Sequence, residues 1–349
     1  MRMNIIRKAI ASVFVLTAFL CQSAYAVSID KIIMFGDSLS DNGNVYSITK
    51  TAHDTLPLIP IIPQEPVYYH GRFSNGPVWI ENLASSMNVE LKDFAYGGSW
   101  VEPITVSKLS MPISLSMQVN FYLVEALTDT NIDKHLYVIW AGGNDYIKGR
   151  SDIDEATTNT VKIIKDQLDW LRFYGAKNFL VLNLPDLSVV PQVVDQGSAF
   201  VEQEREMTTQ HNRKLAVMIK EEQIANPGDK ILFGDLTSYM DDVISNPAKY
   251  HLKNVSEPCF GGGYFFHLAN AVNTKEVDAA KDARIDIMNN ASLREAYLMS
   301  KLATSGAKAC DNPDEYLFWD HLHPTRMMHL IISTTAKELL YENGVSGKY

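Results

Sequence analysis

The sequence predicts an α/β protein in which helices cover both faces of one parallel sheet. Short apolar runs recur along the chain, and longer amphipathic stretches lie between them. Strands that are apolar along their whole length belong to sheets buried on both faces, so this alternation indicates a three-layer α/β/α architecture. Ligands bind at the carboxyl ends of the strands in such sheets, which directs attention to the residues that follow each strand.

The expected strands, about five in number, are the apolar runs at residues 31–35, 91–95, 135–140, 178–182 and 230–233. The expected helices occupy residues 77–87, 115–127, 154–173 and 200–222, and a last helix begins after Pro324 and ends near Tyr341. Ser38, Gly98 and Asn144 each lie just past an expected strand, so we expect them at one rim of the sheet.

The pattern of residues 1–26 predicts a secretory signal peptide. Basic residues, an apolar core and a small-residue cleavage site follow one another: Arg2, Arg7 and Lys8, then residues 9–20, then residues 24–26. The apolar core is too short to span a bilayer. A lipid anchor on Cys21 is the alternative, but Leu20 is bulkier than lipoprotein processing usually accepts. We therefore expect an exported protein, in the periplasm or outside the cell.

The rest of the chain, residues 27–349, is long enough for one large domain with a full core. The formal net charge of the 349 residues is −10, and loss of three cations with the signal changes it to −13. Phosphate binding needs clustered Lys and Arg, so we expect no nucleic acid partner.

Two cysteines, Cys259 and Cys310, remain after the signal. An even pair in an exported chain predicts one disulfide, which would frame an insertion over residues 259–310 and stabilise the fold by about 4 kcal/mol. Two unrelated buried thiols are the alternative. The insertion opens with a glycine-rich turn and the aromatic run 264–266, and continues with a helical stretch over residues 275–303.

Prolines interrupt the regular pattern between residues 53 and 70. They stand three apart, at Pro57, Pro60, Pro63 and Pro66, which matches one turn of a polyproline II helix. This segment is either a stiff connector or an apolar wall beside the functional site.

Residues 35–44, at the end of the first strand, form a small, polar, glycine-bearing turn that carries Ser38. A serine hydroxyl is a poor nucleophile unless a base takes its proton and fixed donors receive the developing charge. The base is expected in residues 320–324, where His323 would act as general base and acid and Asp320 would orient it. His321 is the competing base. A metal site formed by Asp320, His321 and His323 is disfavoured, because no other His- or Cys-rich segment completes it.

Two glycine-bearing turns offer hydrogen-bond donors for an oxyanion. One, residues 141–145, carries the Asn144 amide, and the other, residues 95–99, carries the Gly98 N–H. Taken alone, each turn is a weak signal, because glycine and asparagine are common in ordinary turns. With the N–H of Ser38 they would form a three-donor oxyanion hole.

These four blocks, in this order and at this spacing, resemble those of the GDSL or SGNH hydrolases. Residues 71–76 and 316–320 are similar to further signatures of the lipase-like branch, which includes plant GDSL lipases, bacterial thermolabile haemolysins and glycerophospholipid–cholesterol acyltransferases. One departure is Asp93, which stands where the second block often begins with Asn. The resemblance implies a flavodoxin-like sheet of about five parallel strands, an acyl-enzyme on Ser38 and no cofactor.

The resemblance also implies a phospholipid or lysophospholipid substrate, transient contact with a membrane surface, and a sterol or another alcohol as an alternative acyl acceptor. In the acyltransferase-type branch a disulfide-framed loop can be nicked after export, which implies an activating protease for the 259–310 insertion. An esterase acting on acetylated polysaccharide is the second hypothesis. A third is a binding protein with an inactive hydrolase fold, against which the intact Ser38, Asn144, Asp320 and His323 argue.

Overall fold

The computed structural model describes residues 27–55, 57, 61–101, 113–147, 150–262 and 308–347. Several expectations lie outside the described residues: the signal at 1–26 with Cys21, Pro60 of the proline series, the aromatic run 264–266 and the helical stretch 275–303.

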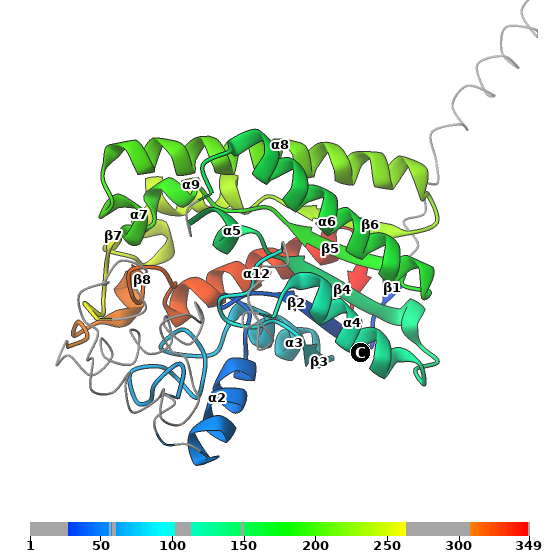
Figure 1. Cartoon of the computed structure of the whole chain (residues 1–349), viewed down its shortest axis with the longest axis horizontal. Coiled ribbons are helices and arrows are strands. Elements are labelled where there is room, and N and C mark those ends of the chain that lie inside the picture. Colours follow the sequence, from blue (N-terminus) through cyan, green and yellow to red (C-terminus); the bar gives the residue numbers. More distant parts are fainter. Residues whose placement is uncertain are drawn as a thin grey trace, which may run out of the picture.

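A five-stranded parallel sheet forms the centre of the molecule (Figure 1), in the spatial order β3-β2-β4-β5-β6. Its strands are β2 (Lys31–Gly36), β3 (Glu90–Asp93), β4 (His135–Trp140), β5 (Asn178–Leu182) and β6 (Lys230–Gly234). Counted along the chain, this is the order 2-1-3-4-5 of flavodoxin-like folds. The predicted fold class is therefore confirmed. Chain order reverses between β2 and β4, and the carboxyl ends of these two strands mark the expected ligand crevice.

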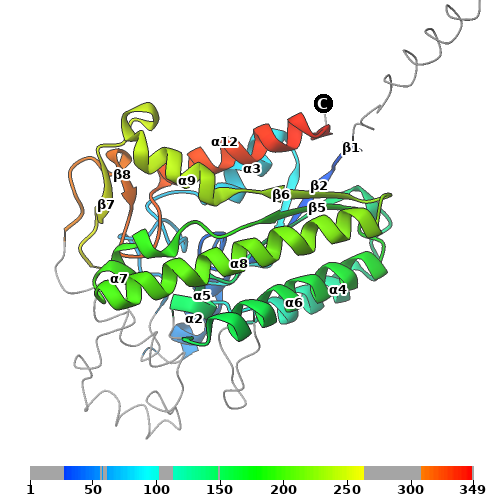
Figure 2. The same cartoon turned by 90° about the horizontal axis from the view of Figure 1, so that it is seen from above.

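Helices cover both faces of the sheet, as Figure 2 shows from above. One face carries α3 (Trp79–Met87), α9 (Leu236–Ser245) and α12 (Arg326–Glu342), and the other carries α4 (Leu115–Ala126), α6 (Ile153–Phe173) and α8 (Ser198–Ala225). Strand residues alternate between the two apolar cores because successive side chains of a strand point to opposite faces. In β2, Ile32 and Met34 join the core under α3 and α12, while Ile33 and Phe35 join the core under α4 and α6.

Smaller elements complete the described part of the chain. They are β1 (Val27–Ser28), α2 (Asn44–Thr55), α5 (Gly143–Ile147), α7 (Pro191–Val194), β7 (Asn254–Pro258), β8 (Tyr316–Phe318) and β9 (Val345–Ser346). Short 3-10 turns lie at Ile132–Lys134, Leu187–Val189, Pro247–Tyr250 and Pro313–Glu315. Strands β1 and β9 pair in parallel, so the two ends of the described chain meet.

The proline-rich segment does not form a continuous polyproline II helix. Residue 57 lies in a turn, and residues 62, 63 and 65–71 form bends and turns. Ile62 and Tyr68 are buried in a small third core with Phe73, Phe260 and Trp319. The polyproline prediction is therefore wrong over the described part, because the apolar side chains of this segment pack inward.

Cys259 and Cys310 are joined by a disulfide with an S–S distance of 1.98 Å. The residues around Cys259 pair with the chain that leads into the 320–324 block. The N–H of Cys259 donates to the carbonyl of Phe318 at 3.0 Å, and that of Phe260 donates to Trp319 at 2.7 Å. The Phe260 and Trp319 rings stack with centroids 5.7 Å apart. Both ends of the insertion are thus fixed beside the expected catalytic acid.

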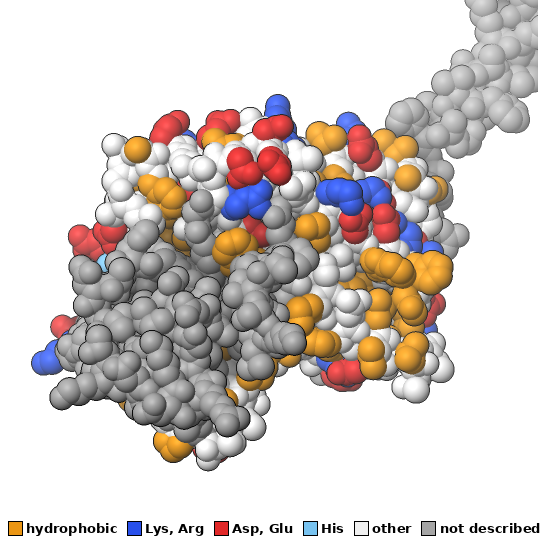
Figure 3. Space-filling view, viewed as in Figure 1, with side chains coloured by type: hydrophobic (Ala, Val, Ile, Leu, Met, Phe, Trp, Pro, Cys, Tyr) orange, Lys and Arg blue, Asp and Glu red, His pale blue; other side chains and the backbone are white. Residues whose placement is uncertain are grey.

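Exposed apolar side chains gather on α4 and at the end of α6 (Figure 3). Val124, Leu127, Trp170 and Phe173 are the most exposed of them. These helix ends lead into β4 and β5, so the patch lies at the edge of the sheet opposite to the one from which Ser38 projects. None of the described helices is long and apolar enough to cross a membrane.

Candidate active site

The nucleophile turn follows directly from the end of β2. A side chain at Gly36 would place its Cβ 2.5 Å from the carbonyl oxygen of Trp140, so only glycine fits there. The carbonyl of Asp37 then accepts hydrogen bonds from the N–H groups of Ser40 and Asp41, each at 3.0 Å. This tight turn projects Ser38 beyond the carboxyl end of the sheet, where it is 6 % exposed.

Ser38 and His323 meet although 285 positions separate them. His323 Nε2 lies 2.9 Å from Ser38 Oγ, and His323 Nδ1 lies 2.9 and 3.0 Å from the two carboxylate oxygens of Asp320. An ionised carboxylate only accepts hydrogen bonds, so Nδ1 carries the proton and Nε2 is free to accept the serine proton. The arrangement predicted for Ser38, His323 and Asp320 is therefore present.

A tight turn between β8 and α12 holds the acid and the base. Oδ1 of Asp320 accepts the N–H groups of Leu322 at 2.8 Å and His323 at 2.7 Å, and the N–H of Trp319 donates to the carbonyl of His323 at 2.7 Å. Thr325 caps α12 and accepts the N–H of Met328. The Asp320 side chain therefore sets both the shape of the turn and the orientation of the imidazole.

Asp320 has a further partner that sequence reasoning missed. The hydroxyl of Tyr68 donates to Asp320 Oδ2 at 2.5 Å, and both residues are fully buried. Burial alone would raise the pKa of Asp320, but the charge and hydrogen bonds of His323 and the Tyr68 hydroxyl outweigh it and hold this pKa below its usual value. Asp320 therefore stays ionised beside the imidazole of His323.

His321, the competing base, points elsewhere. Its Nδ1 lies 2.9 Å from Oδ2 of Asp195, at the end of α7. The ring of His323 instead packs beside that of Phe73, with centroids 5.2 Å apart. Phe73 comes from the 71–76 signature, so that block covers one face of the imidazole.

Asn144 lies in the first turn of α5, directly after β4, and is 6 % exposed. Its Nδ2 donates to the carbonyl of Ser99 at 3.0 Å, which leaves the second amide proton of Nδ2 for another acceptor. Gly98, the residue before Ser99, has a φ of +75° that favours glycine. The structure thus brings the Asn144 block and the Gly98 block together, with Asn144 and Ser38 lining one cavity.

Two carboxyl groups, the buried Asp41 and the half-buried Asp93, hold the turn that carries Ser38. Asp41 accepts N–H groups of Gly43 and Asn44, caps the start of α2, and also accepts the N–H of Gly97 at 2.8 Å. Burial raises its pKa to about 6 despite these bonds. Asp93 accepts the N–H groups of Ala95 and Asn42. The aspartate that stands where the family often has Asn therefore still positions these two backbone groups. Burial, and then the charge of Asp41, raise its pKa well above the usual value.

An apolar cavity adjoins Ser38 and Asn144. It lies between the carboxyl ends of β4 and β5, α9 and α12, and most of its lining side chains are hydrocarbon or aromatic. They are Leu39, Trp140, Ile147, Leu184, Pro185, Leu187, Val190, Met240, Leu317, Phe318, Leu322, Pro324 and Ile332, with Asp37 and Gly143 completing the wall. The hydroxyl of Ser38 therefore stands beside a space suited to an apolar group.

Comparisons with known proteins identify a family for this chain. Residues 32–334 match the family model described as GDSL-like lipase/acylhydrolase. The phosphatidylcholine-sterol acyltransferase of Aeromonas hydrophila is 28% identical over 312 residues, covering 88% of each chain. The thermolabile hemolysin of Vibrio parahaemolyticus is 26% identical over 89% of this chain, which spans 63% of that relative. A lipolytic protein of the G-D-S-L family from Veillonella parvula has a solved structure with a TM-score of 0.38, 13% identity, and coverage of 62% of this chain and 82% of its own.

Proposed function

Because this chain belongs to the GDSL-like lipase/acylhydrolase family, we propose that it cleaves acyl esters of phospholipids or lysophospholipids through an acyl-enzyme on Ser38. Family membership makes it an acyl ester hydrolase or acyltransferase. The step from an ester to a lipid ester rests on one observation, the apolar cavity that begins at Ser38 and Asn144.

The reaction begins when Ser38 Oγ attacks the ester carbonyl and its proton passes to His323 Nε2. The carbonyl oxygen becomes an oxyanion, which receives hydrogen bonds from the N–H groups of Ser38 and Gly98 and from Nδ2 of Asn144. Asp320 stabilises the imidazolium formed at His323. The C–O bond to the leaving alcohol then breaks, and His323 Nε2–H gives its proton to the departing oxygen. The products of this half are a free alcohol and an ester on Ser38.

In the second half of the reaction, water releases the acyl group from Ser38. His323 takes a proton from water while the water oxygen attacks the acyl carbon, and collapse of the intermediate returns the proton to Ser38 Oγ. The product is a carboxylic acid and the free enzyme. A sterol or another alcohol in place of water gives a new ester, and the similarity to the phosphatidylcholine-sterol acyltransferase of Aeromonas hydrophila supports this second acceptor.

The cavity favours long acyl chains over acetyl. Each methylene removed from water contributes roughly 0.8 kcal/mol, so a chain that enters an apolar space next to Ser38 gains binding energy with every carbon. An acetyl group would be too short to contact the side chains that line the cavity, among them Ile147 and Leu184. A preference for acetyl esters is therefore the outcome that contradicts the proposal and favours the polysaccharide esterase.

The test is product analysis by mass spectrometry. The protein spanning residues 27–349 is incubated with vesicles of mixed phospholipids and lysophospholipids, with and without cholesterol. We expect free fatty acid in both cases and cholesteryl ester only when cholesterol is present. Ser38→Ala should abolish all products. Ser40→Ala is the matched control, since Ser40 lies on the same turn but bonds the indole of Trp79.

A further inference from the structure

Gln118 is a fully buried amide on α4 that belongs to none of the four sequence blocks. Its Oε1 accepts the N–H of Gly36 at 2.9 Å, and its Nε2 donates to the carbonyl of the same residue at 2.8 Å. Gly36 is the last residue of β2, two positions before Ser38. A side chain from a distant helix thus pairs with both polar backbone groups at the base of the nucleophile turn.

The same Nε2 also donates to Ser99 Oγ at 2.8 Å. Ser99 follows Gly98, and its carbonyl accepts Nδ2 of Asn144 at 3.0 Å. The carbonyl of Gly36 additionally accepts the N–H of Tyr96, in the same turn as Gly98. One side chain therefore connects the end of β2 to the turn that carries one oxyanion donor and orients the other.

We propose that Gln118 is a positioning residue that holds the Ser38 turn and the Gly98 and Asn144 donors in the relative placement that the oxyanion requires. This inference rests on the proposed function, because it assigns Gln118 a part in acyl transfer. Oxyanion donors act through placement fixed before the reaction, and small displacements of them lower the rate more than they lower substrate binding.

The chemistry of the amide explains why glutamine serves here. A primary amide presents one acceptor and two donors in a single plane, which matches the N–H and C=O of Gly36 and the hydroxyl of Ser99. A carboxylate of the same size keeps only the acceptor. A leucine leaves all three groups buried without this partner, which costs each of them a hydrogen bond.

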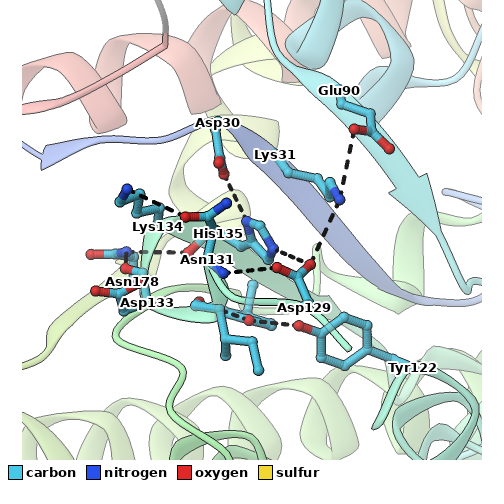
Figure 4. A network of polar contacts seen from close by, with 12 residues as sticks. Asp30, Lys31, Glu90, Tyr122, Asp129, Asn131, Asp133, Lys134, His135 and Asn178 are labelled. Atoms are coloured by element: carbon cyan, nitrogen blue, oxygen red, sulfur yellow. Dashed lines mark hydrogen bonds and ion pairs between the residues drawn. The ribbon is translucent and has the colours of Figure 1, made fainter. Parts of the chain in front are cut away.

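The test compares Gln118→Leu and Gln118→Glu with a control of the same kind, Asn178→Leu. Asn178 is also a buried amide whose Nδ2 donates to backbone carbonyls, those of Asp133 and His135, but it lies at the amino end of β5 (Figure 4). For each protein kcat and KM are measured with a water-soluble p-nitrophenyl ester. Active sites are counted by titration with a fluorophosphonate, and the unfolding temperature is recorded.

We expect both Gln118 variants to lose about 10²-fold in kcat per titrated site, the scale seen when one oxyanion donor is lost, with KM changed less than about threefold. Asn178→Leu should lower the unfolding temperature but leave kcat per titrated site within about twofold, since no donor moves. For Gln118→Glu the kcat relative to wild type should rise as the pH falls, because a protonated carboxyl regains a donor.

An unchanged kcat per titrated site in either Gln118 variant would overturn the inference, as would an equal loss of kcat in Asn178→Leu. Gln118→Glu keeps the size and the acceptor of the native side chain, so it gives a reading even where Gln118→Leu does not fold. Failure of the proposed function is seen separately, because it would appear in the wild-type protein as an absence of Ser38-dependent lipid hydrolysis.

Discussion

The hydroxyl of Tyr68 donates a 2.5 Å hydrogen bond to Oδ2 of Asp320 across 252 positions of sequence. Asp320 thereby has two side-chain partners, Tyr68 on one oxygen and the imidazole of His323 shared between both. The proline-rich segment, which carries Tyr68, is consequently part of the support for the proposed catalytic acid as well as a connector.

Tyr68→Phe should therefore lower kcat about tenfold and raise the pKa of Asp320, because a hydrogen bond to a charged group contributes about 1.5–3 kcal/mol. A carboxyl whose folded pKa is depressed stabilises the fold above its unfolded pKa and loses that contribution as the pH falls. The variant should accordingly unfold at higher pH during acid titration. Tyr137→Phe is the control, since Tyr137 is another buried tyrosine but lies in the central strand β4 and bonds the hydroxyl of Tyr122. Equal losses of kcat in both variants would contradict the assignment.

Asp320→Asn should lower kcat by about 10⁴-fold, because an amide can donate to His323 Nδ1 and so favour the wrong tautomer. Asp195→Asn is a matched control. Asp195 makes the same kind of bond to Nδ1 of His321, the competing base. Steady-state kinetics should show kcat within about twofold of wild type for this control. If Asp195→Asn lost more kcat than Asp320→Asn, His321 and not His323 would be assigned as the base.

Asp93→Asn should gain stability relative to wild type as the pH rises from 4 to 8. Burial raises the pKa of Asp93 in the folded state, so the fold is favoured while this carboxyl is protonated. That contribution is complete below the unfolded pKa of about 3.9 and is lost as the pH rises through the folded value. The amide does not ionise and escapes the loss. Urea unfolding at both pH values measures the difference, and a constant difference between variant and wild type would refute the expectation.

Asp129→Asn should have the opposite pH dependence: its stability relative to wild type should fall as the pH rises. Asp129 accepts a hydrogen bond from His135 Nε2 at 2.9 Å and lies 3.8 Å from Lys31 Nζ (Figure 4). The bond to His135 holds the pKa of Asp129 below its usual value, so its contribution is present above the unfolded pKa and is lost as the pH falls. The variant should be about 1–3 kcal/mol less stable at pH 7, with the deficit shrinking towards pH 3. A deficit that grows on acidification would contradict this sign.

Val190→Phe should shift the substrate preference towards short acyl chains. Val190 lines the cavity beside Ser38, so a larger side chain there removes space for an acyl group. We expect the ratio of kcat/KM for long and short acyl esters to fall about tenfold, equivalent to the loss of roughly two buried methylenes. Val194→Phe, on the same short segment but exposed to solvent, should leave the ratio unchanged. If the ratio were unchanged in Val190→Phe, the cavity would not determine the preference for acyl-chain length.

The strands were predictable because their pattern is local. The apolar runs at 31–35, 135–140 and 178–182 reappear as β2, β4 and β5 with bounds changed by at most one residue. Helix α2 was not expected, since Val45 and Thr49 are its buried residues and no apolar stripe marks it. Its start depends instead on Asp41, which caps it while also bonding Gly97.

The same distinction applies to the site. Ser38, Asp320 and His323 stand in recognisable blocks and could be named from the chain alone. Tyr68 and Gln118 could not, because their partners lie 252 and 82 positions away and the fold alone brings them together. A lone glutamine within the apolar stretch 115–127 was the one available signal for Gln118, and a buried polar residue must have a partner.

The order of these groups along the chain also decides when activity can arise during synthesis. The hydroxyl is at residue 38, the imidazole is at residue 323, and the closing strand β9 that pairs with β1 ends at Ser346. A ribosome that has not yet translated residue 323 has therefore made a serine with no base beside it. We therefore expect chains that terminate before His323 to be inert towards esters, even though they already carry Ser38.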